Sequence, residues 1–505
     1  MTLEPFKREI ARIHDILAAI NLLTWDARVM MPPAGAMARG AQIATLTGLA
    51  RGLATGDALA GAIDAARNEL AGAPADDLDR RAVEQTATAV ATLRRIPAAL
   101  IEEAASLKTV AQAAWAVARR DNDFAGFAPQ LERTIAIQRE IAEAIGYAGH
   151  PYDAMLGLYE PDLDWTSLQA IYKELKAGLL PLVAKAREID RPAPDFLTHT
   201  FPIDRQKAFG QAMAARMGFD FSRGRLDETV HPFEIAFSPQ DVRITARYRE
   251  TFLQGGLFAV WHEAGHGIYE QGIAPGFERS AFATDLVNLY AVGGASFALH
   301  ESQSRLYENR VGRSRRFWEL HFGELYDQFP EQLAGVDADG FWRGVNAVQP
   351  SLIRVEADEL TYDLHIILRS EIEAGLIAGD IAVKDLPGLW REKIQSYLGL
   401  DVPSETLGVL QDVHWSSGMV GSFPTYTLGN IMSSQFFAAA GKQADVTEGL
   451  ETGDYRPLTA WLGRKVHTHA RAFSPDEILR QATGTGLDMA PYLADLSAKV
   501  DALLE

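Results

Sequence analysis

Two histidines and a glutamate in "FAVWHEAGHGIYEQG", residues 258 to 272, have the residue types and the spacing of a catalytic metal site. On a helix, side chains four residues apart project from the same face, so His262 and His266 can bind one ion. Glu263 lies on the adjacent flank, where it can reach a water molecule held by that ion. The pattern predicts metal-assisted hydrolysis with zinc or another borderline divalent ion. The alternative is a buried helix whose histidines are hydrogen-bonded internally.

A catalytic zinc ion needs a third protein ligand. The candidate is Glu301 in "ASFALHESQSRLYENRVG", a segment typical of a second helix. His300 competes with it, but a helix cannot easily aim two consecutive side chains at one ion. We therefore expect Glu301 to bind the metal and His300 to support the site from outside. Asp285 and Glu278 stay open as alternative carboxylate ligands.

Further downstream, "SLIRVEADELTYDLHIILRSEIE" at 351 to 373 predicts a helix with Arg354, Asp358, Thr361 and His365 on one face. A guanidinium binds a carboxylate through two parallel hydrogen bonds, so Arg354 could hold the terminal carboxylate of a substrate. The alternative is an ordinary ion pair between Arg354 and Asp358, one helical turn apart.

The stretch "GVLQDVHWSSGMVGSFPTYTLGN", residues 408 to 430, combines aromatic residues with glycine, serine and proline. This composition favours a structured loop over a helix interior. His414 or Tyr426 could donate a hydrogen bond to a developing oxyanion, although each residue could equally have a structural role.

Most of the chain reads as helix, with apolar residues at helical spacing, as in "PFKREIARIHDILAAINLLTWD". Nothing resembles a flexible tether, so we predict one domain over residues 1–505. Its helical N-terminal part spans about 1–195, and the part with the metal site and cleft spans about 196–505. Prolines and glycines predict breaks between helices at residues 30–35, 71–74, 147–153 and 190–195.

One region departs from the helical pattern. Residues 228–237, "ETVHPFEIAF", and 241–248, "DVRITARY", are rich in β-branched and aromatic residues and are separated by "SPQ". They predict a β-hairpin just before the metal-binding helix. Such a sheet could form one wall of a peptide cleft.

Composition excludes several classes of protein. The 505 residues carry a net charge of −19, with no large basic cluster, so we expect no nucleic-acid partner. No apolar run approaches the roughly 18 residues that span a bilayer, so we expect no membrane segment. The start "MTLEPFKREIARIHD" lacks a signal-peptide core and the chain has no cysteine, which together favour a cytoplasmic location.

An ordered series of motifs resembles the carboxypeptidase Taq family of thermostable zinc metallocarboxypeptidases. The motifs are "HPF" at 231–233, "DVRIT" at 241–245, "HEAGH" at 262–266, "HESQ" at 300–303, "IRVEAD" at 353–358 and "GVLQDVHW" at 408–415. The resemblance implies a mainly α fold with a small β-sheet next to a long active-site groove. It also implies a homodimer that releases single residues from peptide C-termini, with broad specificity and low activity toward proline.

By position, the resemblance makes His262, His266 and Glu301 the ligands of one zinc ion per chain, with cobalt as the alternative metal. It makes Glu263 the general base and assigns Arg354 to the terminal carboxylate of the substrate. His231, Arg243, His414 and Tyr426 are implied to be cleft residues, of which His414 or Tyr426 polarises the scissile carbonyl.

Two other functions compete with this interpretation. A zinc endo-oligopeptidase on a similar helical scaffold would share the metal site, and a helical scaffold protein with a structural metal would share the fold. The connection between "HEAGH" and "HESQ" also departs from the family, because it is longer and more apolar. We expect the extra residues to lengthen a loop or a helix above the metal site and to affect substrate size or dimer contacts.

Overall fold

The structure is a computed structural model that describes residues 3–188 and 194–505. Three separate stretches of chain form each of two compact units. Unit 1 comprises Met1–Leu93, Pro192–Val345 and Gly429–Asp488, and unit 2 comprises Arg94–Arg191, Asn346–Leu428 and Met489–Glu505. The prediction of a single domain stays a prediction, and most of the break predicted at 190–195 lies outside the described residues.

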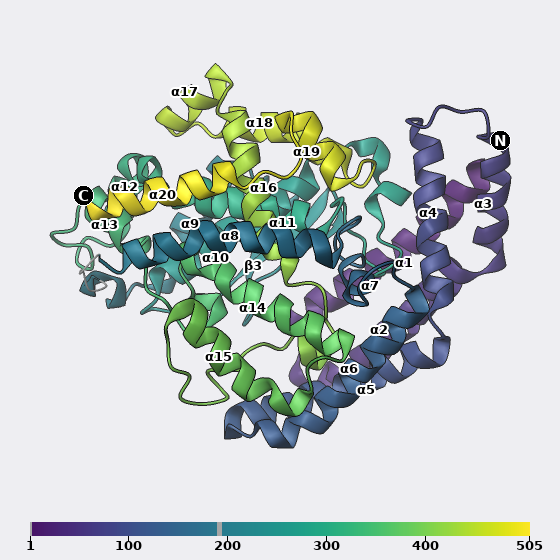
Figure 1. Cartoon of the computed structure of the whole chain (residues 1–505). Helices are drawn as coiled ribbons and strands as arrows, with labels where there is room; N and C mark the ends of the chain where they lie inside the picture. The colour runs from purple at the N-terminus through teal and green to yellow at the C-terminus, as the bar shows by residue number, and fades with distance from the viewer. Residues whose placement is uncertain (1–2, 189–193) are drawn as a thin grey trace. The chain divides into compact units, whose positions relative to one another are not determined.

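Unit 1 contains the metal-binding motif and the only sheet in the described part of the chain (Figure 1). Its first helices are α1 (Leu3–Val29), α2 (Ala36–Thr55), α3 (Asp57–Glu69) and α4 (Leu78–Arg95). The central stretch forms α9 (Ile203–Met217), β1 (Gly224–Glu228), β2 (Glu234–Ser238), β3 (Asp241–Ala246), α10 (Leu253–Gln271), α11 (Phe297–Arg305), α12 (Arg315–Gln328) and α13 (Ala338–Val345). The last stretch adds most of α16 (Pro424–Ala440), α17 (Ala444–Thr452), α18 (Arg456–Lys465) and α19 (Pro475–Thr483).

Among its described residues, unit 2 contains helices and loops but no strand. It contains α5 (Ala98–Asp121), α6 (Phe124–Ile145), α7 (Tyr152–Leu156), α8 (Trp165–Ala186), α14 (Glu359–Ala378), α15 (Leu386–Leu398), the first turn of α16 and α20 (Ala490–Leu504). The mainly helical fold is therefore confirmed, and so are the predicted breaks at 30–35, 71–74 and 147–153.

The apolar spacing that predicted α1 also explains its packing. Phe6, Ile10, Ile13 and Leu17 recur at intervals of three or four residues and are almost fully buried. They join a core cluster that includes Ala50 and other side chains from α2, α3 and α4. Burial of each large side chain in such a cluster contributes about 1.5–3 kcal/mol to folding, so this stripe fixes which face of α1 points inward.

The predicted hairpin is confirmed, but the sheet has a third strand. β2 pairs antiparallel with β3, with Glu234 opposite Ile244, and the register shifts between Ala236 and Ser238. β1 pairs parallel with the other side of β3, which gives the order β1-β3-β2. The sequence did not predict β1, because "GRLDE" lacks the alternation of apolar residues that marks a half-buried strand.

Glycines allow α10 to approach its neighbours closely. A Cβ atom at Gly265 would lie 2.5 Å from the carbonyl oxygen of Gln303 on α11. A Cβ atom at Gly267 would lie 3.2 Å from Cγ2 of Ile244 on β3. The helix with the two histidines thus approaches α11 at a distance that only glycine permits, and it packs tightly against the sheet on its other side.

The long connection between α10 and α11 forms a loop. It contains the short 3₁₀ turns η3 (Pro275–Phe277) and η4 (Ala281–Ala283), followed by a single bridge between Asp285 and Tyr290. Its apolar side chains, including Phe282 and Leu286, are buried in the same core cluster as α1. The connection is therefore a loop whose apolar character reflects this packing, and the expectation that it carries extra residues stays a prediction.

Candidate metal centre

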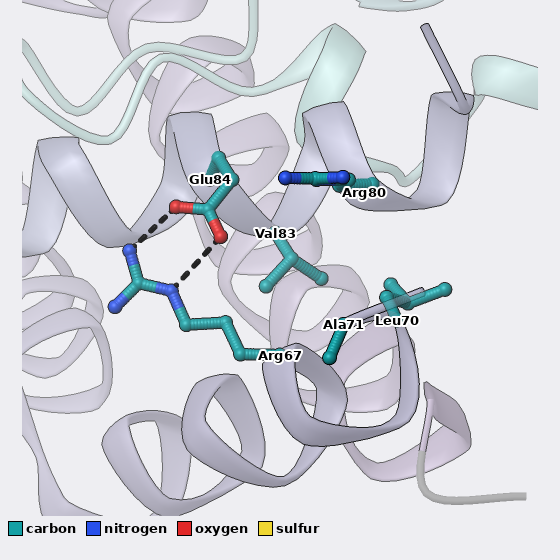
Figure 2. Close-up of a pocket in the computed structure, with 6 residues that line it drawn as sticks. All are labelled: Arg67, Leu70, Ala71, Arg80, Val83 and Glu84. Atoms are coloured by element: carbon teal, nitrogen blue, oxygen red, sulfur yellow. Dashed lines mark hydrogen bonds and ion pairs between the residues drawn. The ribbon is translucent and has the colours of Figure 1, made fainter. Parts of the chain in front are cut away.

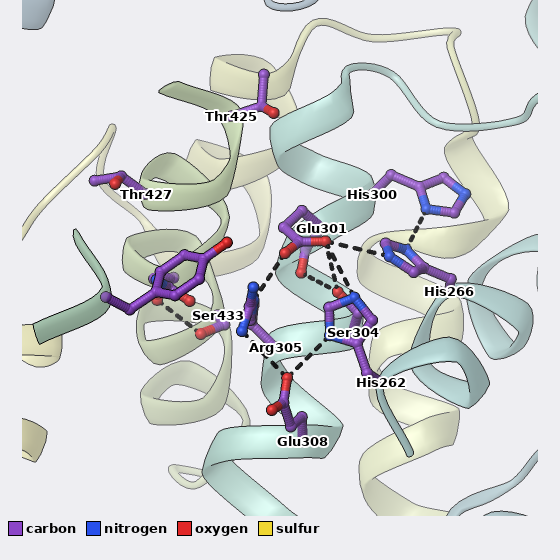
Figure 3. A network of polar contacts seen from close by, with 12 residues as sticks. His262, His266, His300, Glu301, Ser304, Arg305, Glu308, Thr425, Thr427 and Ser433 are labelled. Atoms are coloured by element: carbon purple, nitrogen blue, oxygen red, sulfur yellow. Dashed lines mark hydrogen bonds and ion pairs between the residues drawn. The ribbon is translucent and has the colours of Figure 1, made fainter. Parts of the chain in front are cut away.

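The three predicted metal ligands converge in unit 1. Glu301 Oε2 lies 3.6 Å from His262 Nε2 and 3.2 Å from His266 Nε2, and one ligand atom from each residue lies within 4.8 Å of the others. Ligand bonds of 2.0–2.2 Å around a tetrahedral zinc ion would separate ligand atoms by about 3.4 Å. The donor set and its spacing therefore fit a divalent cation (Figure 3).

The other nitrogen of each imidazole is fixed by a hydrogen bond. His262 Nδ1 lies 2.9 Å from Glu308 Oε2, and His266 Nδ1 lies 2.6 Å from His300 Nδ1. The Nε2 atom of His300 in turn lies 2.9 Å from Glu270 Oε1. These contacts leave both Nε2 atoms facing Glu301, and partners of this kind orient metal-binding histidines. His300 therefore takes the supporting position that was expected of it.

Arg305 holds the carboxylates of the centre in their charged form. Its Nε donates to Glu301 Oε1 at 2.7 Å, and its Nη1 donates to Glu308 Oε2 at 3.2 Å. Burial opposes ionisation of both acids, but Arg305 and His262 keep the pKa of Glu301 well below its usual value. The same two groups help to lower the pKa of Glu308 to about 2. Both side chains are therefore negatively charged at neutral pH.

The state of His266 and Glu263 depends mainly on burial. Burial lowers the pKa of His266 to about 3, so its ring is neutral, as a metal ligand must be. Burial also raises the pKa of Glu263 to about 7, a shift that His262 opposes and Glu301 reinforces. Glu263 is only 6% exposed and follows His262 on α10. It is thus a buried acid next to the ligand cluster.

The alternative ligands are used elsewhere or lie outside the cluster. Asp285 Oδ1 accepts hydrogen bonds from the backbone of Val287 and Asn288, and so stabilises its own turn. Glu278 lies in the loop after η3 and does not belong to the cluster of ligand atoms that the described residues form. Glu301 is therefore the carboxylate of the centre.

A second group of predicted residues comes together in unit 2. Arg354 is 7% exposed, and its Nε and Nη2 donate to Asp412 Oδ1 at 3.1 and 3.0 Å. Arg369, which is fully buried, donates to the other oxygen of Asp412 at 2.7 Å. The Arg354 guanidinium also lies 5.4 Å from the ring centre of Tyr426. Two buried guanidinium groups thus share one carboxylate.

The expected helical face at 351–373 was wrong for Arg354. Arg354 lies in a 3₁₀ turn, Arg354–Glu356, and α14 begins only at Glu359. Asp358 caps this helix by accepting hydrogen bonds from the backbone of Leu360 and Thr361, so it does not pair with Arg354. An N-cap aspartate takes non-helical backbone angles, which ends the continuity that the sequence had suggested.

His414 and Tyr426 both lie near Arg354 in unit 2. His414 Nδ1 lies 3.8 Å from Asp412 Oδ1, and burial together with Arg354 lowers the pKa of His414 to about 4. The imidazole is therefore neutral at pH 7 and can donate a hydrogen bond. Tyr426 lies in the first turn of α16, so the predicted loop ends at residue 423.

The two predicted cleft residues near the sheet, His231 and Arg243, do not belong to the cluster of ligand atoms that the described residues form. Arg243 forms an ion pair with Asp241 at 2.9 Å, and its guanidinium lies 4.3 Å from the ring centre of Trp25. Because successive side chains of a strand alternate, Arg243 is on the opposite face of β3 from Ile244, which contacts α10. His231 is exposed and precedes β2.

Four acidic or basic residues in or beside the metal centre of unit 1 were not predicted: Glu234, Glu270, Arg305 and Glu308. Glu308 follows Glu301 by seven residues, a spacing that could have indicated a shared helical face. However, the chain between Leu306 and Gly312 is a π-helix, a local distortion that no simple sequence pattern announces.

The small hollow between α3 and α4 contributes nothing to this centre. It is lined by Arg67, Leu70, Ala71, Arg80, Val83 and Glu84 (Figure 2). Arg67 donates to both oxygens of Glu84 at 3.1 and 2.6 Å, and Arg80 donates to the carbonyl oxygen of Ala73. Separately, no helix in the described part of the chain has the length and apolar character needed to cross a bilayer.

A helical fold with a His-Glu-x-x-His helix and a carboxylate ligand from the next helix defines a metal-dependent peptidase. The sequence matches the carboxypeptidase Taq (M32) metallopeptidase family over residues 5–500. The chain therefore belongs to this family and is a metallocarboxypeptidase, a peptide hydrolase.

Individual relatives agree with this assignment over nearly their full length. The chain is 36% identical to "Carboxypeptidase 1" of Bacillus subtilis over 504 residues, which cover 98% of each chain. It is 37% identical to "Thermostable carboxypeptidase 1" of Thermus thermophilus over 513 residues, covering 99% of this chain and 97% of that relative. The crystal structure of the M32 carboxypeptidase from Deinococcus radiodurans R1 superposes with a TM-score of 0.93 at 37% identity, covering 99% of each chain.

Proposed function

We propose that the protein releases single C-terminal amino acids from peptides, with broad specificity and with one zinc ion per chain. His262, His266 and Glu301 would hold the ion. The observation that carries this proposal is the convergence of two Nε2 atoms and one carboxylate oxygen, each supported by a partner on its far side. When bound, zinc would act as a Lewis acid that activates water and polarises the scissile carbonyl.

Glu263 is proposed to move the protons of the reaction. It would accept a proton from the attacking water and later deliver it to the amine that leaves. A buried carboxyl group whose pKa is raised to about 7 suits both steps, because neither of its protonation states is strongly favoured at neutral pH. Arg305 and His262, which stabilise the charge of Glu301, keep the ligand carboxylate from competing for that proton.

Arg354 is proposed to bind the terminal carboxylate of the substrate. Support comes from the charges in unit 2, where the buried guanidinium groups of Arg354 and Arg369 both donate to Asp412. The single negative charge of Asp412 neutralises only one of these two positive charges. A protein with a net charge of −19 needs such a local positive charge to attract an anionic chain end. Asp412 and Tyr362, whose hydroxyl accepts from Arg354 Nη1 at 3.1 Å, would hold Arg354 in place while the N–H groups that remain face the substrate.

The remaining predicted residues receive supporting roles. We propose that His414 or Tyr426 donates a hydrogen bond to the oxyanion, since a neutral imidazole and a phenol can both do so. His231 and Arg243 are proposed to contact the peptide further from the scissile bond. A long active-site groove is part of the same proposal.

The Glu263→Gln variant tests the proposed base. It should bind zinc as the wild type does, because glutamine replaces no ligand, but should lose turnover by at least about 10²-fold. Zinc content and the cleavage rate of a short peptide would be measured together. Glu319→Gln, a change at an exposed glutamate of α12, is the matched control and should keep full activity. Wild-type turnover in Glu263→Gln would remove the base from the mechanism.

The Arg354→Ala variant tests the recognition of the chain end. Cleavage of free-acid peptides should fall far more than cleavage of the same peptides with an amidated C-terminus. Equal losses for both would reject the role of Arg354. Mass spectrometry of the products also separates the endo-oligopeptidase alternative, which would give internal fragments instead of a ladder of single-residue losses.

Zinc, a homodimeric assembly and a cytoplasmic location complete the proposal. Metal analysis of the purified protein would distinguish zinc from cobalt, and chelation should abolish activity that either ion restores. Light scattering would show the mass of the assembly. A monomer at all concentrations would contradict the proposed dimer without affecting the metal centre.

A further inference from the structure

Glu234 is an acidic residue on β2 whose side chain faces the metal-binding helix. It lies opposite Ile244 in the antiparallel pair of β2 and β3, and residues opposite each other in such a pair point to the same face of the sheet. Ile244 is fully buried and lies against Gly267 of α10. The side chain of Glu234 is therefore directed toward α10.

The face of α10 around Gly267 carries two more acids. Glu263 precedes Gly267 by four residues and Glu270 follows it by three, so the three residues lie along one face of the helix. Glu263 and Glu270 are also the charged groups that act on Glu234. Three carboxyl groups are thus placed close together, next to the two histidines of the metal centre.

Glu234 differs from its acidic neighbours in having no basic partner. Glu270 accepts a hydrogen bond from the backbone of Gly293 at 2.9 Å and contacts His300. In contrast, Glu234 Oε1 is buried and receives no hydrogen bond from any described residue. Burial, Glu270 and Glu263 all raise the pKa of Glu234 well above its usual value, and no basic group in the described part of the chain opposes them.

We propose that Glu234 is a specificity-determining residue that favours a cationic side chain, lysine or arginine, on a residue flanking the scissile bond. This inference rests on the proposed function, because it requires the peptide to be cleaved beside Glu263. The cation would supply the partner that the carboxyl group lacks. The side chain of Glu234 is half-buried and so remains within reach of a ligand.

The physical reason is the crowding of three carboxyl groups on this face. A buried carboxyl group without a hydrogen-bond partner is costly, and a nearby second and third carboxyl add repulsion. An ammonium or guanidinium group at this position offsets both the missing hydrogen bond and the repulsion between the carboxyl groups, whereas a neutral side chain of the same shape can offset only the missing hydrogen bond. The preference should therefore depend on charge and be almost independent of size.

The test compares peptides that differ only in that charge. The pairs would carry arginine or its neutral isostere citrulline, at the C-terminal position in one series and at the penultimate position in the other, with a leucine peptide as reference. In the wild type, kcat/KM should be about tenfold higher for arginine than for citrulline in at least one series at low salt. In Glu234→Gln, this ratio should fall to about one, while kcat/KM for citrulline and leucine peptides stays within about twofold.

Glu228→Gln is the matched control, because it removes the same charge from the other edge of the same sheet. It should keep the preference for arginine. A wild type that cleaves arginine and citrulline peptides equally in both series would overturn the role of Glu234, even if the variant failed to fold. An equal preference in Glu234→Gln and the wild type would also overturn it. In both cases continued cleavage of the leucine peptide would leave the carboxypeptidase function intact, whereas a wild type that released no C-terminal residue at all would overturn both.

Discussion

Replacement of Gly265 by alanine tests whether the close approach of α10 and α11 builds the metal centre. Gly265 lies between His262 and His266, and a Cβ atom there would lie 2.5 Å from the carbonyl oxygen of Gln303. Real Cβ atoms essentially never come within 3.0 Å of such an atom, and the obstacle is backbone that cannot rotate away. The two helices would have to separate by about 0.5 Å or more.

That separation is large on the scale of metal coordination. Ligand distances in a working site hold to within about 0.2 Å, and α11 carries Glu301 while α10 carries the two imidazoles. We expect Gly265→Ala to weaken zinc binding by about tenfold or more. Overpacking should also lower the free energy of unfolding by about 1–3 kcal/mol, and the better helix propensity of alanine should offset about 1 kcal/mol of this loss.

The assay combines a zinc titration against a competing chelator with denaturant unfolding of the metal-free protein. Gly61→Ala is the matched control, since a Cβ atom at Gly61 in α3 meets no described atom within 4 Å. Gly61→Ala should raise the free energy of unfolding by up to about 1 kcal/mol and leave zinc binding unchanged. If Gly265→Ala bound zinc as tightly as the wild type and gained stability like the control, close approach would not determine the geometry of the site.

Two further changes probe the partners of functional residues. Glu308→Gln removes the charge that orients His262, and should lower zinc affinity by about 10–100-fold in the same titration, while an unchanged affinity would show that the ring needs no such support. Asp412→Asn leaves the buried guanidinium groups of Arg354 and Arg369 without a counter-charge, and should cost about 3–5 kcal/mol in denaturant unfolding at pH 7. Burial opposes the charge of Asp412, but the two arginines lower its pKa below the usual value, so its contribution is present above about pH 4 and is lost as the pH falls further. The difference in unfolding free energy between wild type and Asp412→Asn should therefore shrink on acidification, and a constant difference from pH 7 to pH 3 would contradict this account.

Much of the fold followed from local pattern. The apolar stripe of α1 appears in the sequence at helical spacing, and its burial follows directly from that spacing. The hairpin of β2 and β3 was also visible, because its two strands are adjacent in the chain. β1 was not visible, since its parallel pairing with β3 joins strands across an intervening strand, and nothing local marks such a pairing.

The sequence alone determined the part of the site that one helix can position. His262, Glu263 and His266 lie within two turns of α10, so their relative placement follows from helix geometry whatever surrounds them. Only the tertiary structure decided that Glu301 reaches the same point, because that depends on how α10 and α11 pack. It also decided that Arg354 pairs with an aspartate 58 residues away instead of with its helical neighbour. Contacts across such separations are selected by burial and by packing of whole elements, which the spacing of residues along the chain does not encode.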